Sequence, residues 1–447
     1  MEDKGSIVSA RPFEVTNRQV LAIAVPITLA SFTTPLVGLV GTAIVGQFGN
    51  AELLAGLAAG AVVFDVVYST FTFLRSGTTG LVAQAFGRDD VLEEWTVLSR
   101  ALAIAAISGL ALIQLAPLIA AIGEWLMNPG QAVTAAMDLY IRIRLVSAPA
   151  ALINLVILGY FLGRGEASLG LFLQLLLNGM NFVFSIFLGV YLGWGIAGVG
   201  WGAVCGEVAG MIAGLAILAG RFRAMPRTSP HHTFHDAAMG RMLRLNGNIM
   251  ICDLVLIGAY LLFMRQSAQL STLTLAANAV LMHFLLSAAY FLDGFATAAQ
   301  QLAGRAIGTR DQTAFLRAVT LTVGWGFALA GFASFLGFAF GEPLIGAITK
   351  AADVRAEAAF YLPWAVFTAP SGVLAFQMTG VFEGATWSRD MRNVMLLSFA
   401  AFVPALFALE QMFGNHGLWA AYHIFLLTRG IGLLSVIRRR VRTAFAG

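Results

Sequence analysis

The sequence predicts an all-α polytopic membrane protein with twelve transmembrane helices, arranged as two six-helix, parallel-repeat lobes around a central cavity. Three observations predict this fold. The 447 residues are 59% hydrophobic and 11% charged, with a mean hydropathy of +0.81, whereas a soluble domain carries about 25% charged residues. Apolar runs of about 20 residues, enough to cross a bilayer, recur along the whole length. One long stretch of the sequence also occurs twice.

The repeated stretch covers residues 57–90 and 275–311. A shift of 218 aligns its first part, and after a three-residue insertion a shift of 221 aligns its end and later positions. Matched pairs are Leu57 with Leu275, Phe73 with Phe291, Gly87 with Gly308, Tyr140 with Tyr361 and Gly159 with Gly380. Collinear matches of this kind indicate a duplicated half.

The apolar runs are expected to be helices, because a backbone in lipid must satisfy its hydrogen bonds internally. The expected spans are 18–46, 52–86, 94–123, 134–162, 168–192, 195–219, 242–265, 272–304, 313–340, 354–384, 391–412 and 416–437. Spans longer than the hydrocarbon thickness are expected to tilt or to project beyond the lipid.

The longest polar insert, residues 221–240, contains two prolines and separates six spans from six. We therefore expect an N-terminal lobe at 1–220, a cytoplasmic linker at 221–240 and a C-terminal lobe at 241–447. An even number of spans per half means that both halves enter the membrane from the same side. The halves are thus parallel repeats, and a substrate site is expected between them.

The distribution of Lys and Arg predicts the orientation. With both termini inside, 20 of the 27 basic residues fall in inner segments, and three fall in outer loops: Arg265, Lys350 and Arg355. This bias predicts cytoplasmic termini in a bacterial-type inner membrane. The net charge of +4 is explained by these span ends, so we expect the lipid bilayer as a partner and no nucleic acid.

Two local patterns are assigned no chemistry. His231, His232 and His235 lie in the polar linker beside prolines and without cysteines, which does not favour a structural metal site. Residues 193–198 match G-x-G-x-x-G, but that fingerprint requires a strand before it and a βαβ unit around it. Here it joins two membrane spans, and we expect a tight external turn.

Ionisable residues inside spans are the most informative positions, since each costs about 2.5–3.5 kcal/mol on insertion scales. Asp253, Glu207 and Asp65 fall near the middle of spans seven, six and two, and the 218 shift pairs Asp65 with His283. These four are the candidates for proton or cation coupling. The alternative is that each is a locally satisfied polar group.

The same shift pairs Arg75 with Asp293, so the two halves carry opposite charges at one place. We expect this pair to bridge the halves as an inter-lobe gate when the inner side is closed. The alternative is that each charge finds a partner within its own half.

Several uncharged polar residues within spans are candidates for the substrate cavity. They are Asn154, Asn178, Asn181, Thr34 and Gln377. Side-chain amides can coordinate a cation through oxygen or bond a substrate, but they also serve as contacts between helices.

Pro26 and Pro35 lie in the first span. A proline inside a helix removes an amide donor and bends the helix. Pro26 is the candidate hinge, and a static kink is the alternative.

Four motifs carry a resemblance to a known family. They are PLVGLVGTAIVGQFGN in span one, FLRSGTTGLVAQAFGR in span two, FLDGFATAAQQLAGRAIG in span eight and FEGATWSRDMRN after span ten. With two six-helix halves, the chain resembles the multidrug and toxic compound extrusion (MATE) transporters, DinF-like branch, over nearly its whole length. The resemblance implies efflux of organic, often cationic, compounds in exchange for protons or sodium ions by alternating access. It also implies that the first span bends at a proline like Pro26.

The chain departs from that family where DinF-like members usually carry aspartates. Gly41, Ser185 and Thr379 stand at those three places. Asp253 lies near the position at which other MATE branches hold an acidic residue in span seven, and Glu383 is an additional acid in span ten. We therefore expect coupling to have moved toward the C-terminal lobe.

The sequence thus predicts a secondary antiporter that exports amphipathic or cationic organic compounds in exchange for H+ or Na+, acts as a monomer and needs no cofactor beyond the coupling ion. The sequence has no arrangement of residues typical of a catalytic site, so we do not expect an enzyme. One alternative is a lipid-linked-precursor flippase, which a basic central cavity formed by Arg142, Arg144 and Arg429 would favour. The other is a membrane-embedded receptor or scaffold without transport.

Overall fold

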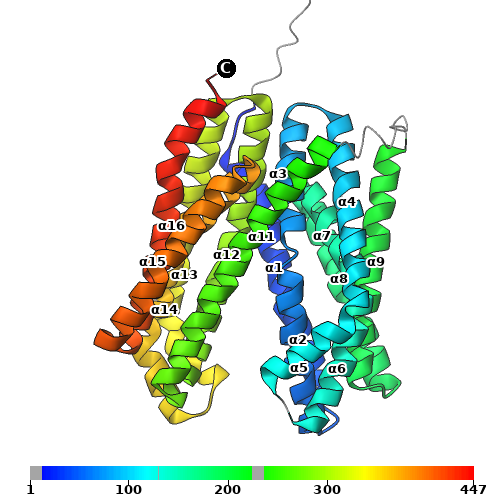
Figure 1. Ribbon diagram of the computed structural model, residues 1–447, viewed down its shortest axis with the longest axis vertical. Coiled ribbons are helices and arrows are strands. Elements are labelled where there is room, and N and C mark those ends of the chain that lie inside the picture. The colour runs from blue at the N-terminus through cyan, green and yellow to red at the C-terminus, as the bar shows by residue number, and fades with distance from the viewer. Residues whose placement is uncertain (1–12, 129, 224–235, 447) are drawn as a thin grey trace, which may run out of the picture.

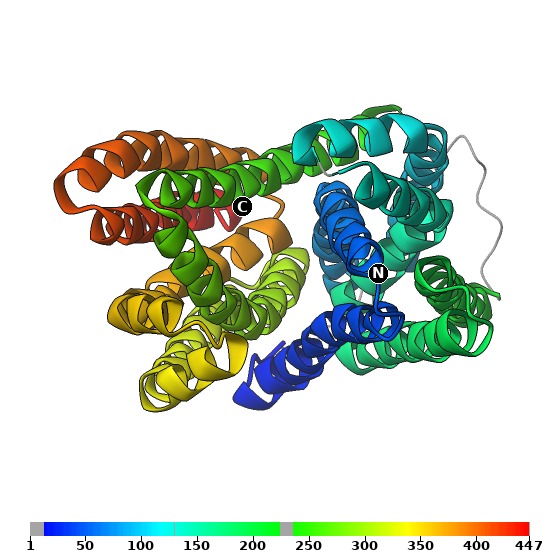
Figure 2. The same cartoon turned by 90° about the horizontal axis from the view of Figure 1, so that it is seen from below.

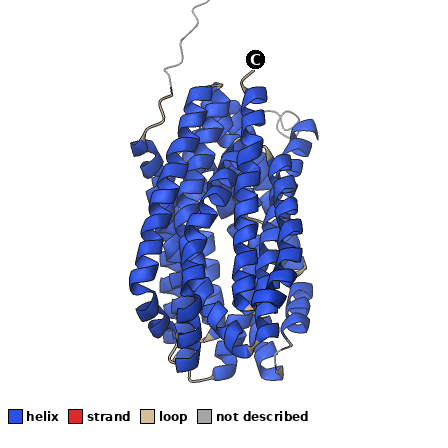
Figure 3. Cartoon of the chain, turned by 90° about the vertical axis from the view of Figure 1, so that its left-hand side faces the viewer, coloured by secondary structure: helices blue, strands red, loops and turns tan. Residues whose placement is uncertain are grey.

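The structure, a computed structural model, describes residues 13–128, 130–223 and 236–446. All regular elements in these ranges are helices (Figure 3). The first half contains α1 (Asn17–Gly46), α2 (Ala51–Ser69), α3 (Phe73–Gly87), α4 (Val91–Gln114), α5 (Ala116–Met127), α6 (Gln131–Val146), α7 (Ala148–Gly163), α8 (Ala167–Ile186), the π-helical turn η1 (Phe187–Tyr191) and α9 (Ile196–Phe222). The second half contains α11 (Asp236–Leu270), α12 (Thr272–Thr309), α13 (Gln312–Ile348), α14 (Ala352–Gly384), α15 (Ser388–Phe413) and α16 (Asn415–Ala444).

The predicted twelve-span membrane fold is confirmed. Within the described ranges, eleven helical segments are long and apolar enough to cross a bilayer, and the pair α6–α7, bent by 52°, makes a twelfth. The expected span 94–123 is two helices, because Pro117 at the start of α5 cannot continue the hydrogen bonding of α4.

The helices form two bundles that meet near the end of the molecule where α16 finishes and diverge toward the other end (Figures 1 and 2). We call these the terminal end and the far end. Helices α1–α9 make up one bundle, the first lobe, and α11–α16 make up the second lobe. Most of the predicted linker, residues 224–235, lies outside the described ranges, so the limits of the two lobes stay a prediction. His231, His232 and His235 belong to this segment and are likewise not described.

The backbone conformation shows the duplication, because its special features recur 221 residues apart. Three residues with positive φ recur at that spacing: Asp89 and Arg310, Gly165 and Thr386, and Gly193 and Gly414. The N-cap aspartates of α4 and α13, Asp90 and Asp311, are also 221 apart, and each accepts a hydrogen bond from a first-turn amide at 2.9 Å. Turns and caps therefore repeat along with the helices.

The shift of 218 predicted for the first part of the repeat is wrong. Gly159 packs against the Arg75 carbonyl, and its equivalent Gly380 packs against the Ala296 carbonyl. Arg75 therefore corresponds to Ala296, 221 residues on, and not to Asp293. The N-caps of α2 and α12, Asn50 and Ser271, are also 221 apart. The apparent three-residue insertion came from apolar letters that match by chance within two helices of almost equal length.

A break in the helix at residues 70–72 separates α2 from α3, whereas α12 runs through the equivalent region. Hydroxyls at the break donate to backbone carbonyls three residues earlier, with Thr70 bonded to Val67 at 2.7 Å and Thr72 to Ser69 at 2.8 Å. Such bonds compete with the regular helical pattern and bend helices.

The two lobes touch through equivalent residues of α3 and α12. A Cβ on Gly87 would lie 3.1 Å from the Gly308 Cα, and one on Gly304 would lie 2.7 Å from the Ala83 Cβ. Both pairs differ by 221, so the contact is the same patch on each half, as at a two-fold axis. Glycine at these places allows the two backbones to approach closely, as in other membrane helix pairs.

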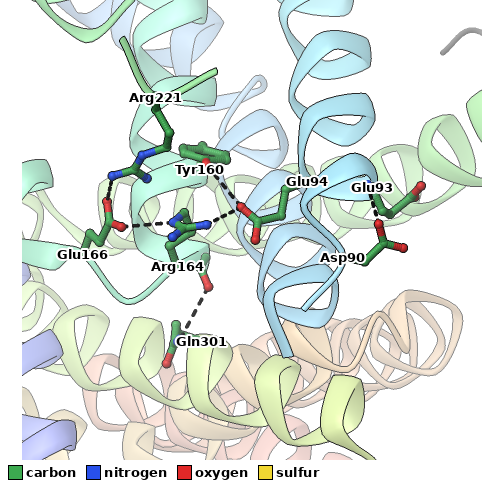
Figure 4. A network of polar contacts seen from close by, with 9 residues as sticks. Asp90, Glu93, Glu94, Tyr160, Arg164, Glu166, Arg221 and Gln301 are labelled. Carbon is green, nitrogen blue, oxygen red and sulfur yellow. Dashed lines mark hydrogen bonds and ion pairs between the residues drawn. The ribbon is translucent and has the colours of Figure 1, made fainter. Parts of the chain in front are cut away.

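Within each lobe, a different kind of interaction holds the helices together at the terminal end. In the first lobe, the buried Glu94 accepts hydrogen bonds from Arg164 at 2.6 Å and Tyr160 at 3.2 Å (Figure 4). Arg164 and Arg221 also bind Glu166, at 3.0 and 2.7 Å. At the equivalent of Glu94 the second lobe has Phe315, whose ring lies 5.7 Å from those of both Trp387 and Phe445. An ion-pair network in one lobe thus replaces an aromatic cluster in the other.

We predict that Gly308→Ala lowers the apparent melting temperature of the purified protein. A Cβ at this position would overlap the Gln84 carbonyl oxygen of the other lobe, and overpacking typically costs about 1–3 kcal/mol. Gly331→Ala is the matched control, because this exposed glycine of α13 has open space around its Cβ. Thermal unfolding in detergent measures both. Equal melting temperatures for the two variants would contradict the close lobe contact.

Candidate functional site

Arg75 of α3 and Asp293 of α12 meet at the junction of the lobes. Arg75 Nη1 lies 3.4 Å from Asp293 Oδ2, and Nη2 lies 3.4 Å from Oδ1. The two side chains are 24% and 34% exposed. The geometry is a two-pronged ion pair between lobes, although the two residues are not equivalent in the repeat. That the pair acts as a gate remains a proposal.

Asp253 of α11 bonds to the break between α2 and α3. The Thr72 hydroxyl lies 2.7 Å from Asp253 Oδ2, and the same hydroxyl lies 2.8 Å from the Ser69 carbonyl oxygen. One hydroxyl proton can serve only one of these acceptors. Asp253 therefore reaches across the lobe junction through a partner that can either donate to it or accept from it.

Arg429 of α16 is buried, with 6% exposure. It donates a hydrogen bond to Thr379 Oγ1 at 2.6 Å, and its Nη1 has no partner among the described residues. Asp253 and Glu383 are the carboxylates whose charges act on this guanidinium. Thr379 stands where the resemblance implied an aspartate. The nearby Asp253 and Glu383 thus supply the negative charge that Arg429 requires.

These five groups form what we call the central cluster: Arg75, Asp253, Asp293, Glu383 and Arg429. Electrostatic interactions connect Glu383 with Asp253, Arg75 and Asp293, and Arg429 with Asp253 and Glu383. The cluster thus holds three carboxyl groups and two guanidinium groups within electrostatic range of one another, and the Arg75–Asp293 pair is in direct contact. Fully ionised, the cluster lacks one positive charge, which one proton or one monovalent cation would supply.

A cavity of about 290 Å³ adjoins the central cluster. Arg75 and Thr72 line it together with two tyrosines, Tyr68 from the first lobe and Tyr290 from the second. Most of the remaining wall is apolar and comes from α1, α7 and α8. A cavity with apolar walls, aromatic rings and a few polar groups suits an amphipathic organic molecule.

A second polar group lies within the first lobe. Asn154 donates to Glu207 Oε2 at 2.8 Å, and to the Glu207 carbonyl oxygen at the same distance. The Arg144 guanidinium lies 3.9 Å from the centre of the Phe64 ring. Its charge acts on both Asp65 and Glu207. Asp65 and Glu207 therefore share Arg144 as a basic neighbour. This group is separate from Asp253.

His283 does not join these groups. The 221 register places Leu286 opposite Asp65, so the predicted Asp65–His283 pair is wrong. The exposed His283 lines a separate cavity of about 360 Å³ that α12, α13 and α14 surround with mainly apolar side chains. The mistaken register had made an isolated histidine appear to be a symmetric partner.

Three predicted cavity amides are buried and hydrogen-bonded within the protein, two of them between helices and one within α8. Asn178 donates to Thr33 Oγ1 at 2.5 Å and ties α8 to α1. Asn181 accepts from Ser185 at 2.8 Å. Gln377 has 0% exposure and donates to the Leu292 carbonyl at 3.3 Å. None of the three lines the cavity beside the central cluster, and their role in binding substrate stays a prediction. The Thr34 side chain lies outside the described part of the structure.

Packing around the other two neutralised positions leaves little space. A Cβ on Gly41 would lie 3.1 Å from Val199 Cγ1, and Gly202 packs directly on Ser185. Small residues thus accommodate the neighbouring helix α9 where the resemblance implied aspartates. Glu207, also on α9, is an acid that remains in this part of the lobe, and it shares Arg144 with Asp65.

Pro26 lies in α1, which packs against both α8 and α12. On the α12 side, Gly294 sits against the Ala24 carbonyl and Thr28. Because proline cannot donate to the preceding turn, the helix is weakened where both lobes hold it. This placement is compatible with the proposed hinge.

Two parallel lobes, a charged centre between them and an adjoining apolar cavity define a membrane transporter built from repeats. The MatE family pattern matches residues 26–187 and 249–407, and the chain belongs to this family of multidrug efflux transporters.

Relatives and solved structures agree with that assignment. DNA damage-inducible protein F of Escherichia coli (strain K12) is 32% identical over 426 residues, covering 94% of this chain and 92% of that protein. Protein DETOXIFICATION 43 of Arabidopsis thaliana is 24% identical over 477 residues, covering 94% and 90%. A solved outward-facing conformation of a multidrug resistance MATE family transporter of the MOP superfamily has a TM-score of 0.87 at 17% identity, covering 96% of each chain, and shows the same fold.

We predict that reversing either charge of the Arg75–Asp293 pair destabilises the protein and that reversing both restores much of the loss. Arg75→Asp places two carboxylates face to face, and Asp293→Arg places two guanidinium groups face to face. In a double-mutant cycle, residues in direct contact show coupling energies of about 0.5–3 kcal/mol. Apparent melting temperatures of the four proteins measure the coupling. Additive losses in the double variant would contradict a direct pair.

Proposed function

We propose that this protein is a secondary antiporter that exports amphipathic or cationic organic compounds from the cytoplasm in exchange for H+ or Na+. The observation that carries the proposal is the central cluster at the lobe junction, which combines three carboxyl groups with two guanidinium groups around the Arg75–Asp293 ion pair. A proton or a monovalent cation supplies the missing positive charge. The cavity next to the cluster offers the place for substrate.

Asp253 is the proposed coupling residue. When its carboxylate is ionised, Thr72 donates to it at 2.7 Å. When the carboxyl group carries a proton, it can donate to the Thr72 oxygen, and the Thr72 hydroxyl can then turn to the Ser69 carbonyl at 2.8 Å. Both protonation states thus have satisfied hydrogen bonds. Thr72 belongs to the first lobe and lies at the break between α2 and α3. A change in the protonation of Asp253, in the second lobe, therefore changes a hydrogen bond of the first lobe.

Alternating access follows from the lobe arrangement. The lobes touch at the terminal end and diverge toward the far end (Figure 1). The bias of Lys and Arg supports a cytoplasmic terminal end, so the described state faces outward. The Arg75–Asp293 pair is the proposed gate of this state, and Glu207 with Asp65 forms a secondary candidate for ion binding. A bound ion shifts the lobes only through its different affinity for the two states.

The three arginines that would favour a flippase do not assemble in a common cavity. Arg142 pairs with Asp138 at 2.7 Å on an exposed face, Arg144 lies on Phe64, and Arg429 is buried on Thr379. This separation favours the antiporter. We propose an inner-membrane location and a monomer.

We predict that Asp253→Asn reduces gradient-driven efflux from proteoliposomes by about tenfold or more, because asparagine can hold neither a proton nor a cation by charge. Efflux is measured with a proton gradient and with a sodium gradient separately, and the gradient that drives the unmodified protein identifies the ion. Asp138→Asn, which removes a partly exposed carboxylate on α6, serves as the control. Undiminished gradient-driven efflux in Asp253→Asn would remove Asp253 from coupling.

A further inference from the structure

A cavity of about 560 Å³ lies at the terminal end, between the lobes and apart from the central cluster. Its first-lobe wall comes from α3 and α4, and its second-lobe wall comes from α11, α15 and α16. Six arginines line it: Arg88, Arg100, Arg241, Arg244, Arg389 and Arg440. Glu93 and Asp390 are the acidic residues in the lining. We call this feature the arginine cavity.

The lining has more positive charge than its own acids neutralise. Arg100 lies 3.6 Å from Glu93, and Arg440 pairs with Asp390. The other four arginines take part in no ion pair within the described ranges. Among the described lining residues, six positive charges against two negative ones leave a formal charge of four. Arginines crowded around a cavity without matching acids repel one another unless an anion is present.

Other features of the wall also suit an anion. Helix α15 begins at Ser388 in the lining, without a side-chain cap. The first-turn amides of a helix have no partner within the helix and carry a partial positive charge. Every basic residue of the lining is arginine, whose planar guanidinium group binds phosphate oxygens in pairs. The donors therefore match a phosphate group better than a single carboxylate.

We propose that the arginine cavity binds a phosphate-bearing anion between the lobes and that the bound anion holds the terminal end closed. The first lobe contributes Arg88 and Arg100, and the second lobe contributes the other four arginines. The complete site exists only while the lobes are together, so the anion must favour that state. The effect on transport rests on the proposed alternating access, whereas binding itself does not.

The phosphate has two possible sources, a soluble phosphate compound or the headgroup of an anionic phospholipid. Full-length protein in neutral detergent is titrated by calorimetry with pyrophosphate in one arm and with phosphatidylglycerol micelles in the other. Phosphatidylcholine micelles are the neutral control. We expect saturable binding in at least one of the two phosphate arms, and the arm that saturates identifies the source.

The variant Arg241→Gln/Arg389→Gln is expected to raise the dissociation constant about tenfold or more. Its control is Arg438→Gln/Arg439→Gln, which removes the same charge from exposed positions near the end of α16 that are not in the lining. The control is expected to change the constant less than about twofold. If the first variant does not fold, the single change Arg389→Gln at an exposed side chain replaces it. Absence of saturable binding, or equal weakening by variant and control, would overturn the site.

Closure is measured separately as a distance between spin labels at Asp89→Cys and Thr443→Cys, two exposed positions on different lobes at the terminal end. The background carries Cys205→Ala and Cys252→Ala. The binding probe should increase the population of the short distance, and Arg241→Gln/Arg389→Gln should abolish this response. Binding without any change in the distance distribution would overturn the closing role. Because neither readout needs transport, failure here is distinct from failure of the antiport proposal.

Discussion

The close approach of α3 and α12 is the contact on which the rest of the structure depends. Gly87 faces Gly308 and Ala83 faces Gly304, and each pair consists of equivalent residues of the two halves. In lipid, helices gain little from burying apolar surface against one another, so close packing of small residues is what holds them together. Because the contact lies at one end only, the lobes can stay joined there while they diverge at the other end.

That contact also determines where the charges meet. Thr72, in the break at residues 70–72, bonds to Asp253 of the second lobe, and Arg75 of α3 pairs with Asp293. Glu383 and Arg429 complete the cluster from α14 and α16. Charges at membrane depth persist only when they pair or face water. Here the pairing crosses the lobe interface, so in the proposed alternating access ion binding and lobe movement would act on the same groups.

The two lobes have diverged in how they are held together. Glu94 and its arginine network stabilise the terminal end of the first lobe (Figure 4). Phe315 and its aromatic neighbours do so in the second lobe. The charged centre is asymmetric as well, since Asp253, Glu383 and Arg429 all belong to the second lobe. This asymmetry supports the proposal that coupling is centred on the second lobe.

Periodicity and composition were sufficient to predict the twelve spans and the duplication, because a lipid environment leaves helices as nearly the only way to satisfy the backbone. Intramembrane charges such as Asp253 and Arg75 could be identified for the same reason, since such residues are costly and rare. The register of the repeat could not be predicted, because apolar letters match at several shifts and only the contacts of Gly159 and Gly380 distinguish them. Likewise, only the tertiary structure decided that Gln377 is buried, that His283 stands apart and that Arg429 faces Asp253 and Glu383. Those properties depend on which faces of different helices pack against each other. No local pattern in a single sequence predicts which helix will be the partner of a given face.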